Sequence, residues 1–323
     1  IDPQSGTTLT LGTSGDTVTI PSGVSLAPGG GLTLTGALAV DGGTIKLDGN
    51  YPTGTDNVAL GDTALDSVEA SGNCNVAVGS KAGTAITTGD NNTGIGVLAL
   101  SATTTASNNV VVGRKAMCTN TTGASNTAIG NQSLEQNTTA NNNTAVGKSA
   151  LAANTTGTPN TAVGFEALDA NTTGGQNTGI GVGSFGASTT ASNNTGLGYA
   201  SGLSNTTGAC NTALGHSALC TNTSASNNTA VGFSALKVNT TGTQNVAVGR
   251  NAGDANTEGT NNVALGDSAL SSNTTADGNT AVGRASLHSN TTGTRNTAVG
   301  NDALFTNTTG NENASFGNLS LDA

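Results

Sequence analysis

A five-residue sequence motif, typified by Asn160-Thr161-Ala162-Val163-Gly164, recurs along most of the chain. Its closing glycine returns with a constant 17-residue period, from Gly79 and Gly96 to Gly317, and only the first step, from Gly61 to Gly79, is longer by one. A strict period over so many copies is typical of a solenoid, in which each repeat is one coil that buries its apolar face only against neighbouring coils. The sequence therefore predicts an all-β solenoid of sixteen coils rather than a compact globule.

The composition fits a narrow core. Of the 323 residues, 34% are hydrophobic, 2% are aromatic and none is Trp, which is too little to fill the interior of a globular domain of this length. A solenoid core can be filled by Val, Ile, Leu, Ala and Thr alone. Abundant Asn, Thr and Gly are also found in disordered chains, but a disordered chain does not keep its apolar residues in fixed columns.

Charge and hydropathy argue against two kinds of partner. The formal net charge of −10 disfavours a rod that coats DNA or RNA. No apolar run reaches the length of about 18 residues that a membrane helix needs, so no membrane insertion is expected. The chain begins with Ile1 rather than Met, which indicates a fragment or a processed product.

The repeat divides the chain into two parts. Residues 1–56 lack it and residues 57–323 carry it. The N-terminal part holds short alternating segments separated by Gly, Pro and Asp, at 8–11, 17–20, 32–35 and 44–47. Such segments are typical of thin strands. We expect 1–56 to form a stalk or connector and 57–323 to form the β-solenoid.

Positions in each coil are described by their distance from the closing glycine. Asn stands four residues before it in all sixteen coils, from Asn57 to Asn313, which predicts a ladder of amide hydrogen bonds from coil to coil. Thr or Val stands three before it and Val, Ile or Leu one before it, and strand alternation predicts that both columns face the core. A Leu of the second limb, such as Leu168, is expected to fill the core opposite them. Gly83, Gly202 and Gly253 replace that Leu in three coils, which we expect to be thinner or locally reshaped.

The residue two before the closing glycine is nearly always Ala or Gly. A solvent-facing strand position would be free to vary in size and charge, so a column of small, uncharged residues suggests that another backbone lies against it. We expect that backbone to belong to a second copy of the chain. The residues predicted to form this chain-to-chain interface are Ala145, Ala162, Gly179 and Gly196.

The repeat Asn-Thr-Ala-Val-Gly-x-x-Ala-Leu, followed by Asn-Thr-Thr-Gly, resembles the head repeats of trimeric autotransporter adhesins of the YadA type. It resembles still more the longer variant found in bacteriophage tail fibres and related surface proteins that end in a self-cleaving intramolecular chaperone. The resemblance covers residues 57–316. It implies a left-handed parallel β-roll, three chains side by side, and a role in attachment.

Few residues suggest chemistry. A Gly-x-Gly-x-x-Gly match occurs at 181–186, but its first glycine is the repeat glycine and no strand-turn-helix unit surrounds it. His216 and His288 are the two histidines of the chain and cannot build a His-rich metal site. We therefore expect that the chain is not an enzyme and that it binds neither a cofactor nor a metal ion. The Asn-Thr-Thr triplets are interpreted as turn chemistry rather than as glycosylation sites.

The cysteines occupy two positions of the repeat, either five before or five after the closing glycine. They lack the paired spacing of a zinc site. We expect free thiols in outward positions rather than disulfides. The four are Cys74, Cys118, Cys210 and Cys220.

The position just after the closing glycine varies freely and includes four of the nine basic residues, Arg114, Lys148, Arg250 and Arg284. In five successive coils it holds what we call the aromatic ribbon: Phe165, Val182, Tyr199, His216 and Phe233. Coils stack about 4.8 Å apart, so these side chains are expected to line up over about 20 Å. Such a ribbon can bind sugars or proteins, or it can stack against an adjacent chain or stabilise its own coil stack.

The sequence as a whole predicts a homotrimeric fibre segment, from a phage tail fibre or similar virion appendage, that spaces and presents a host-attachment surface. Its partners would be its own copies and a host cell-surface glycan or protein. A bacterial trimeric surface adhesin or extracellular filament is the alternative. An ice-binding solenoid is a third hypothesis, which the adjacent rather than alternate Thr pairs of Asn-Thr-Thr disfavour.

Overall fold

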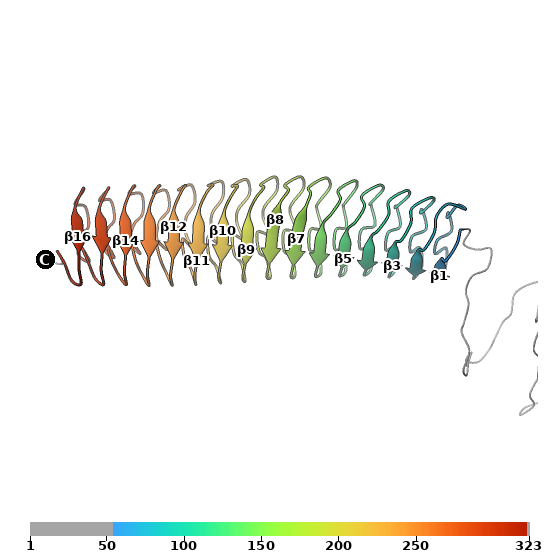
Figure 1. Cartoon of the computed structure of the whole chain (residues 1–323), viewed down its shortest axis with the longest axis horizontal. Helices are drawn as coiled ribbons and strands as arrows, with labels where there is room; N and C mark the ends of the chain where they lie inside the picture. The colour runs from blue at the N-terminus through green and yellow to red at the C-terminus, as the bar shows by residue number, and fades with distance from the viewer. Residues whose placement is uncertain (1–53, 322–323) are drawn as a thin grey trace, which may run out of the picture. The chain divides into compact units, whose positions relative to one another are not determined.

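The computed structural model describes residues 54–321, which form one solenoid built from a single parallel sheet (Figure 1). The sheet has sixteen strands in chain order, each hydrogen-bonded to the next, and the described residues include no helix. The predicted parallel β-solenoid with 17-residue coils is thus confirmed. The thin strands expected at 8–11, 17–20, 32–35 and 44–47 lie outside the described residues.

Each coil contributes one strand of three or four residues, and the rest of the coil is turns. The strands are β1 (Val58–Leu60), β2 (Val76–Val78), β3 (Thr93–Ile95), β4 (Val110–Val112), β5 (Thr127–Ile129), β6 (Thr144–Val146), β7 (Asn160–Val163), β8 (Asn177–Ile180), β9 (Thr195–Leu197), β10 (Thr212–Leu214), β11 (Thr229–Val231), β12 (Val246–Val248), β13 (Val263–Leu265), β14 (Thr280–Val282), β15 (Thr297–Val299) and β16 (Ala314–Phe316).

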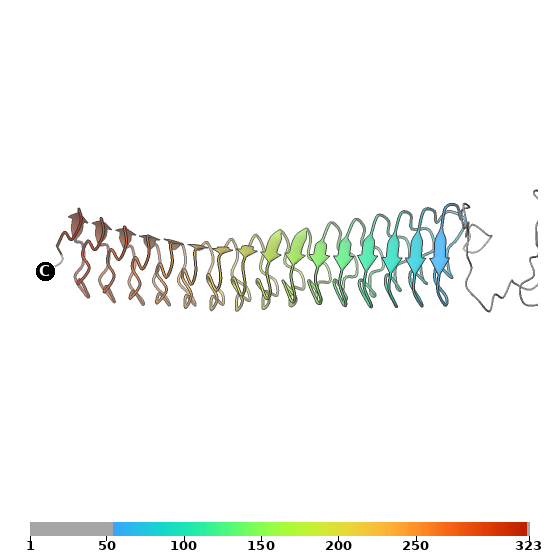
Figure 2. The same cartoon turned by 90° about the horizontal axis from the view of Figure 1, so that it is seen from below.

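The register pairs like with like. Between β7 and β8, Thr161 lies beside Thr178 and Val163 beside Ile180, and the other pairs keep the same alignment. Every position of the repeat therefore becomes a continuous column along the rod. Figure 2 shows that the strands turn progressively from one end of the solenoid to the other, so the sheet is twisted.

The side chains of the strands point the opposite way from the prediction: the residue two before the closing glycine lies in the core, and its two neighbours lie on the outer face. Ala162 is fully buried, whereas Thr161 and Val163 on either side of it are only partly buried, and the same alternation runs through the sheet. The second limb of the coil lies so close to the strand that in most coils only a methyl group or a hydrogen stands between them, and Val111 and Ser315 are the larger side chains buried in this column. A Cβ at Gly179, for example, would lie 3.0 Å from Leu168 Cγ and 3.1 Å from the Ser184 carbonyl oxygen.

The predicted chain-to-chain interface is therefore wrong. Ala145, Ala162, Gly179 and Gly196 are all buried inside their own coils. Their small size reflects the narrow interior of the coil and not the approach of another chain. The columns expected in the core, with Thr or Val and then Val, Ile or Leu, instead form the outer surface of the sheet.

The leucine of the second limb fills the core as predicted. Leu151, Leu168 and Leu219 are fully buried, and they pack against the alanine column rather than against Val. Each has a positive φ, between 51° and 53°, a left-handed conformation that costs about 1–2 kcal/mol for a non-glycine residue. Burial of a Leu side chain contributes about 1.5–3 kcal/mol, which offsets that cost coil by coil.

Where glycine replaces this leucine, the backbone keeps its path and a neighbouring side chain fills the space. Gly202 has φ +61°, close to the leucine value. The fully buried Phe185 ring of the preceding coil occupies its place, because a Cβ at Gly202 would lie 2.6 Å from Phe185 Cζ. Gly196 belongs to the same arrangement, since a Cβ there would lie 2.7 Å from Phe185 Cδ2. The expected local reshaping is thus confined to side chains.

The closing glycine allows adjacent coils to approach. Gly164 has φ +137°, and a Cβ on it would lie 2.7 Å from the carbonyl carbon of Gly181 in the next coil. Both the backbone conformation and the contact exclude a side chain. The same geometry recurs at the closing glycines of the stack, which explains the strictness of the period.

The predicted asparagine ladder is present. Asn160 Oδ1 accepts a hydrogen bond from the backbone N–H of Asn177 at 2.9 Å, and Asn160 Nδ2 donates to the Gly174 carbonyl at 2.8 Å. A second ladder was not predicted: in the Asn-Thr-Thr-Gly turns, Asn171 Nδ2 donates to Asn154 Oδ1 at 2.9 Å and to Gly174 O at 3.0 Å. Asn154 and Asn171 are fully buried, so the folded coil does not present these amides for glycosylation.

Candidate contact surface

The outer face of the sheet is a continuous uncharged surface. We call it the Thr/Val face, and it comprises the residues three before and one before each closing glycine. The first column holds Thr or Val in fifteen coils and Ala314 in the last, while the second holds Val, Ile or Leu in fifteen coils and Phe316 in the last. Side chains on it are substantially exposed, including Ile95 at 39% and Leu197 at 50%.

The extent of this face is unusual for a single chain. Fifteen steps between sixteen strands, at about 4.8 Å each, make it about 70 Å long. Monomeric proteins rarely expose contiguous apolar surface on this scale, and larger patches mark interaction sites. The Thr/Val face is therefore the strongest candidate for a contact surface among residues 54–321.

The aromatic ribbon runs along one edge of this face. The fixed step of the coils places its five residues in one column, as predicted, and all are on the surface. Phe165 is 40% exposed, Val182 45%, Tyr199 58% and Phe233 53%, and His216 is also exposed. Each ribbon residue follows the last strand residue of the Thr/Val face by two positions, as Tyr199 follows Leu197.

The rings of the ribbon stack on one another. The centroids of Tyr199 and His216 are 5.0 Å apart with an interplanar angle of 21°, and those of His216 and Phe233 are 5.3 Å apart at 20°. Ser217 Oγ lies 3.0 Å from His216 Nδ1, which fixes the imidazole orientation further. Both faces of the His216 ring are covered, so the stack presents ring edges to the outside.

This stacking limits what the ribbon can bind. An aromatic platform for sugars offers a free ring face to the apolar side of a pyranose, and in this stack the faces are largely occupied by neighbouring rings. Edges of stacked rings suit packing against another apolar surface. The geometry favours the second interpretation of the ribbon, namely a stabilising or interchain stack.

Charged side chains border the ribbon at both ends. Lys148 Nζ lies 5.2 Å from the centroid of the Phe165 ring, a cation–π arrangement. Beyond Phe233, Arg250 makes a two-pronged contact with Asp267 of the next coil, at 3.0 to 3.1 Å. A hydrogen bond from Ser268 and those from Arg250 hold the pKa of Asp267 below its usual range. Surface ion pairs of this kind contribute little stability, but they define where the apolar ribbon ends.

A second aromatic stack was not predicted. His288 and Phe305 lie one coil apart, five residues after their closing glycines, with ring centroids 4.9 Å apart and an interplanar angle of 14°. The signal was present in the sequence, because the two residues are separated by one 17-residue step. This pair gives the chain a second stack of similar chemistry at a different position of the coil.

The four cysteines are free thiols. Cys74 and Cys210 are exposed, as predicted, while Cys118 and Cys220 are partly buried. Burial raises the pKa of the Cys118 and Cys220 thiols, and the nearby Glu135 carboxylate adds to the effect at Cys118. A raised pKa keeps these two thiols protonated and weakly nucleophilic at neutral pH.

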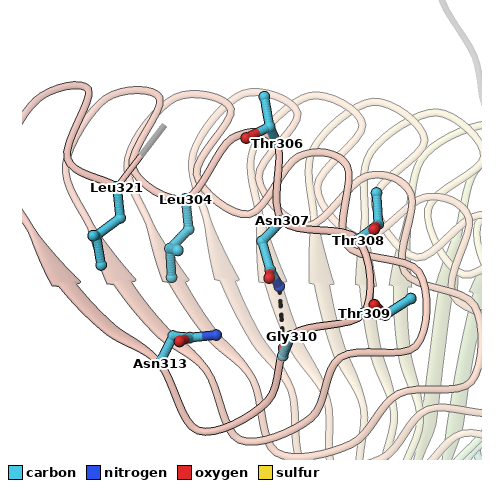
Figure 3. A pocket seen from close by; sticks show the side chains of 8 residues that line it. All are labelled: Leu304, Thr306, Asn307, Thr308, Thr309, Gly310, Asn313 and Leu321. Carbon is cyan, nitrogen blue, oxygen red and sulfur yellow. Dashed lines mark hydrogen bonds between the residues drawn. The ribbon is translucent and has the colours of Figure 1, made fainter. Parts of the chain in front are cut away.

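The last described coil contains a hollow of about 370 Å³. Figure 3 shows Leu304 and Leu321 on one side of it and the Asn307 side chain, which donates a hydrogen bond to Gly310 O, on the other. These are the same core and turn positions that each coil presents to the next one. The hollow is thus the interior of the coil seen end-on, without a charged or catalytic group in its lining. Its lining residues are Leu304, Thr306, Asn307, Thr308, Thr309, Gly310, Asn313 and Leu321.

Within residues 54–321, no group of three or more His, Cys, Asp or Glu side chains is placed to hold a metal ion. The same residues contain no helix long and apolar enough to span a bilayer. Comparison with known proteins finds no matching family model, no significantly similar curated protein and no significantly similar solved structure.

Proposed function

We propose that this chain is a segment of a homotrimeric surface fibre, from a phage tail fibre or similar virion appendage, that spaces and presents a host-attachment surface. The observation that carries the proposal is the Thr/Val face, which stays uncharged and at least partly exposed through all sixteen coils. A rod that keeps one face free of charge along its whole described length is suited to lie beside other rods.

Three parallel copies can bury this face around a common axis. A face about 70 Å long and about 10 Å wide offers about 700 Å² per chain, close to the area of about 800 Å² per partner in stable protein interfaces. Because neither column carries a charge, association leaves no ion buried without a partner. Threefold closure also prevents open-ended lateral growth, which a single sticky face on a rod would otherwise permit.

The rest of the coil suits a spacer. Asparagine ladders and the threonine hydrogen bonds, such as Thr155 Oγ1 to Thr172 O at 3.1 Å, tie each coil to the next. Stiffness then comes from a repeated local contact, so length can be set by the number of coils. In this role the fibre holds its receptor-binding surface, for a host glycan or protein, away from the particle that carries it.

The resemblance that supports a virion appendage extends in a lesser degree to bacterial surface adhesins, and neighbouring genes distinguish the two. Tail-assembly genes and a C-terminal chaperone indicate a phage, whereas a membrane-anchor barrel indicates a bacterium. Ice binding is disfavoured by the sheet twist in Figure 2, because ice requires a flat array. The first Thr of the turn also donates its hydroxyl to the next coil and is not free for water.

Introducing charge on the Thr/Val face tests the proposal. Thr161→Glu with Ile180→Glu should convert the trimer to monomers, as measured by native mass spectrometry and light scattering. Thr173→Glu is the matched control, because Thr173 is exposed on the turn and Glu258 occupies the same position of another coil. An unmodified chain that is monomeric at micromolar concentration, or a face variant that stays trimeric, would contradict the proposal.

A further inference from the structure

We infer that the aromatic ribbon sets the axial register between the chains of the fibre, so that its partner is the equivalent ribbon of a second copy. The inference rests on the proposed side-by-side assembly and goes beyond it. It concerns the axial position at which neighbouring chains contact one another, whereas the Thr/Val face determines only which sides of the chains are in contact.

The Thr/Val face alone specifies the axial register between chains poorly. Its first column holds Thr or Val and its second Val, Ile or Leu in every coil but the last, and the closing glycines are evenly spaced throughout from Gly79. A neighbour displaced by one coil, about 4.8 Å, again places small, uncharged Thr or Val side chains beside Thr or Val, and aliphatic side chains beside aliphatic ones. Only one coil in sixteen loses its contact. A sheet surface that repeats itself in this way is prone to register slippage.

The ribbon breaks the repetition at one place. At the position after the closing glycine, bulky apolar or aromatic side chains occupy five consecutive coils, from β7 to β11. Directly before this run stands Lys148, and directly after it stands Arg250, paired with Asp267. In register, each ribbon lies at the height of the neighbouring ribbon. A shift of one coil instead brings an end of one ribbon level with a charged side chain of the other.

The rings of the ribbon are also held in an orientation suited to contact with another protein surface. Stacking of Tyr199, His216 and Phe233 fixes the rings and leaves their edges exposed. The ribbon adjoins exposed side chains of the Thr/Val face, because Ile180 is 36% and Leu197 50% exposed. In these coils a column of bulky side chains therefore lies beside the Thr column and the Val, Ile or Leu column of the face. Preorganised side chains lose little conformational freedom on contact, which suits a local feature that must discriminate between nearly equivalent registers.

Electron paramagnetic resonance can read the register directly. A spin label on Cys74, which is exposed and lies five coils before Phe165, reports the distances between chains in a Cys118→Ser, Cys210→Ser, Cys220→Ser background. The parent should give a single narrow distance. Replacement of Phe165, Tyr199, His216 and Phe233 by Ser should leave trimers by native mass spectrometry but broaden the distribution, with added components from chains displaced by whole coils. Ser80 occupies the same position in another coil, so serine is compatible with the fold there.

The matched control removes the other stack. His288→Ser with Phe305→Ser deletes rings of similar chemistry at a different position of the coil and should leave one narrow distance. A ribbon variant that is trimeric with an unchanged narrow distance would overturn the inference. So would a ribbon variant that is monomeric but folded by circular dichroism, because the ribbon would then be required for association itself. A monomeric parent without dipolar coupling would instead refute the proposed assembly.

Discussion

Phe185 and Gly202 are predicted to be strongly coupled, because one side chain fills the core space of two coils. Phe185 is fully buried, and a Cβ at Gly202 would lie 2.6 Å from its Cζ. Ordinary neighbouring coils carry a leucine at both positions, as Leu151 and Leu168 do. The perturbation is therefore a double-mutant cycle of Phe185→Leu, Gly202→Leu and the pair.

The magnitudes follow from the geometry. Phe185→Leu removes three carbon atoms from the core, which at about 0.8 kcal/mol per buried carbon, with a cavity contribution, costs about 3 kcal/mol. Gly202→Leu in the presence of the ring overpacks the same space and costs about 3 kcal/mol or more. The double variant restores the ordinary Leu-Leu arrangement and should be within about 1 kcal/mol of the parent. The coupling energy, which is the double-variant loss minus the two single-variant losses, then has a magnitude of about 5 kcal/mol or more, above the range of about 0.5–3 kcal/mol usual for contacting residues.

Native-state hydrogen exchange is the appropriate assay, because a repeat array opens locally as well as globally. The Phe185 amide donates to Ser201 O, and the Gly202 amide donates to Ala218 O, both at 2.9 Å. The opening free energies of these two amides should fall in each single variant and recover in the double variant. Additive losses, with the double variant the least stable of the four proteins, would refute the description of a shared core space.

Three further outcomes are expected. Gly164→Ala should lower the urea midpoint strongly and expose amides of the two coils it joins, because a Cβ there would lie 2.7 Å from the Gly181 carbonyl carbon. A decrease of only a few tenths of a kcal/mol in the free energy of unfolding would contradict this packing. Leu236→Phe alone should lower the stability of the fold, and adding Ala247→Gly should restore it. The two changes together recreate, beside Gly253, the arrangement that Phe185 has with Gly196 and Gly202. Thermal melting of both variants checks this prediction. Asp169→Asn should stabilise the fold at pH 7, because burial and then Glu166 raise the pKa of Asp169. A raised carboxyl pKa penalises the folded state at neutral pH, and the penalty fades as pH falls through the folded value and is absent below about 4. An equal gain at pH 3 and pH 7 would contradict this assignment.

The sequence predicted the parts of the fold that depend on periodicity. One 17-residue step aligns every position into a column, and this alone predicts the parallel sheet, the asparagine ladder of Asn160 and Asn177, the buried leucines and the single-file ribbon. These features require only that coils stack in register. The second asparagine ladder was missed because Asn-Thr-Thr-Gly was interpreted only as a turn, without asking where its buried amide would find partners.

The sequence did not reveal which face of the strand lies inside. Alternation defines two faces but does not assign them, and a small column such as Ala162 and Gly179 is compatible with a narrow interior or with a close neighbour. The distance between the two limbs of a coil decides the matter, and it depends on the left-handed turns around residues such as Leu168, at φ +51°. One clue was present: Gly196 and Gly202 both stand near Phe185 in the repeat, as expected if small and large residues share one core.

The stacking of the ribbon also lay beyond the sequence. A common column predicted that Tyr199, His216 and Phe233 would be neighbours, but the orientation of their rings depends on side-chain rotamers and on the twist of the sheet. That orientation matters for function, because covered ring faces favour contact with another apolar surface over sugar stacking. The ribbon thus illustrates how a site can be located by sequence period while its chemistry depends on geometry.

The proposed assembly is tested most directly by the oligomeric state of the unmodified chain, measured by native mass spectrometry from nanomolar to micromolar concentration. A species of three times the chain mass should persist on dilution and should dissociate when Thr161 and Ile180 are replaced by Glu. A species of one chain mass throughout this range would contradict the central claim that the Thr/Val face joins three copies.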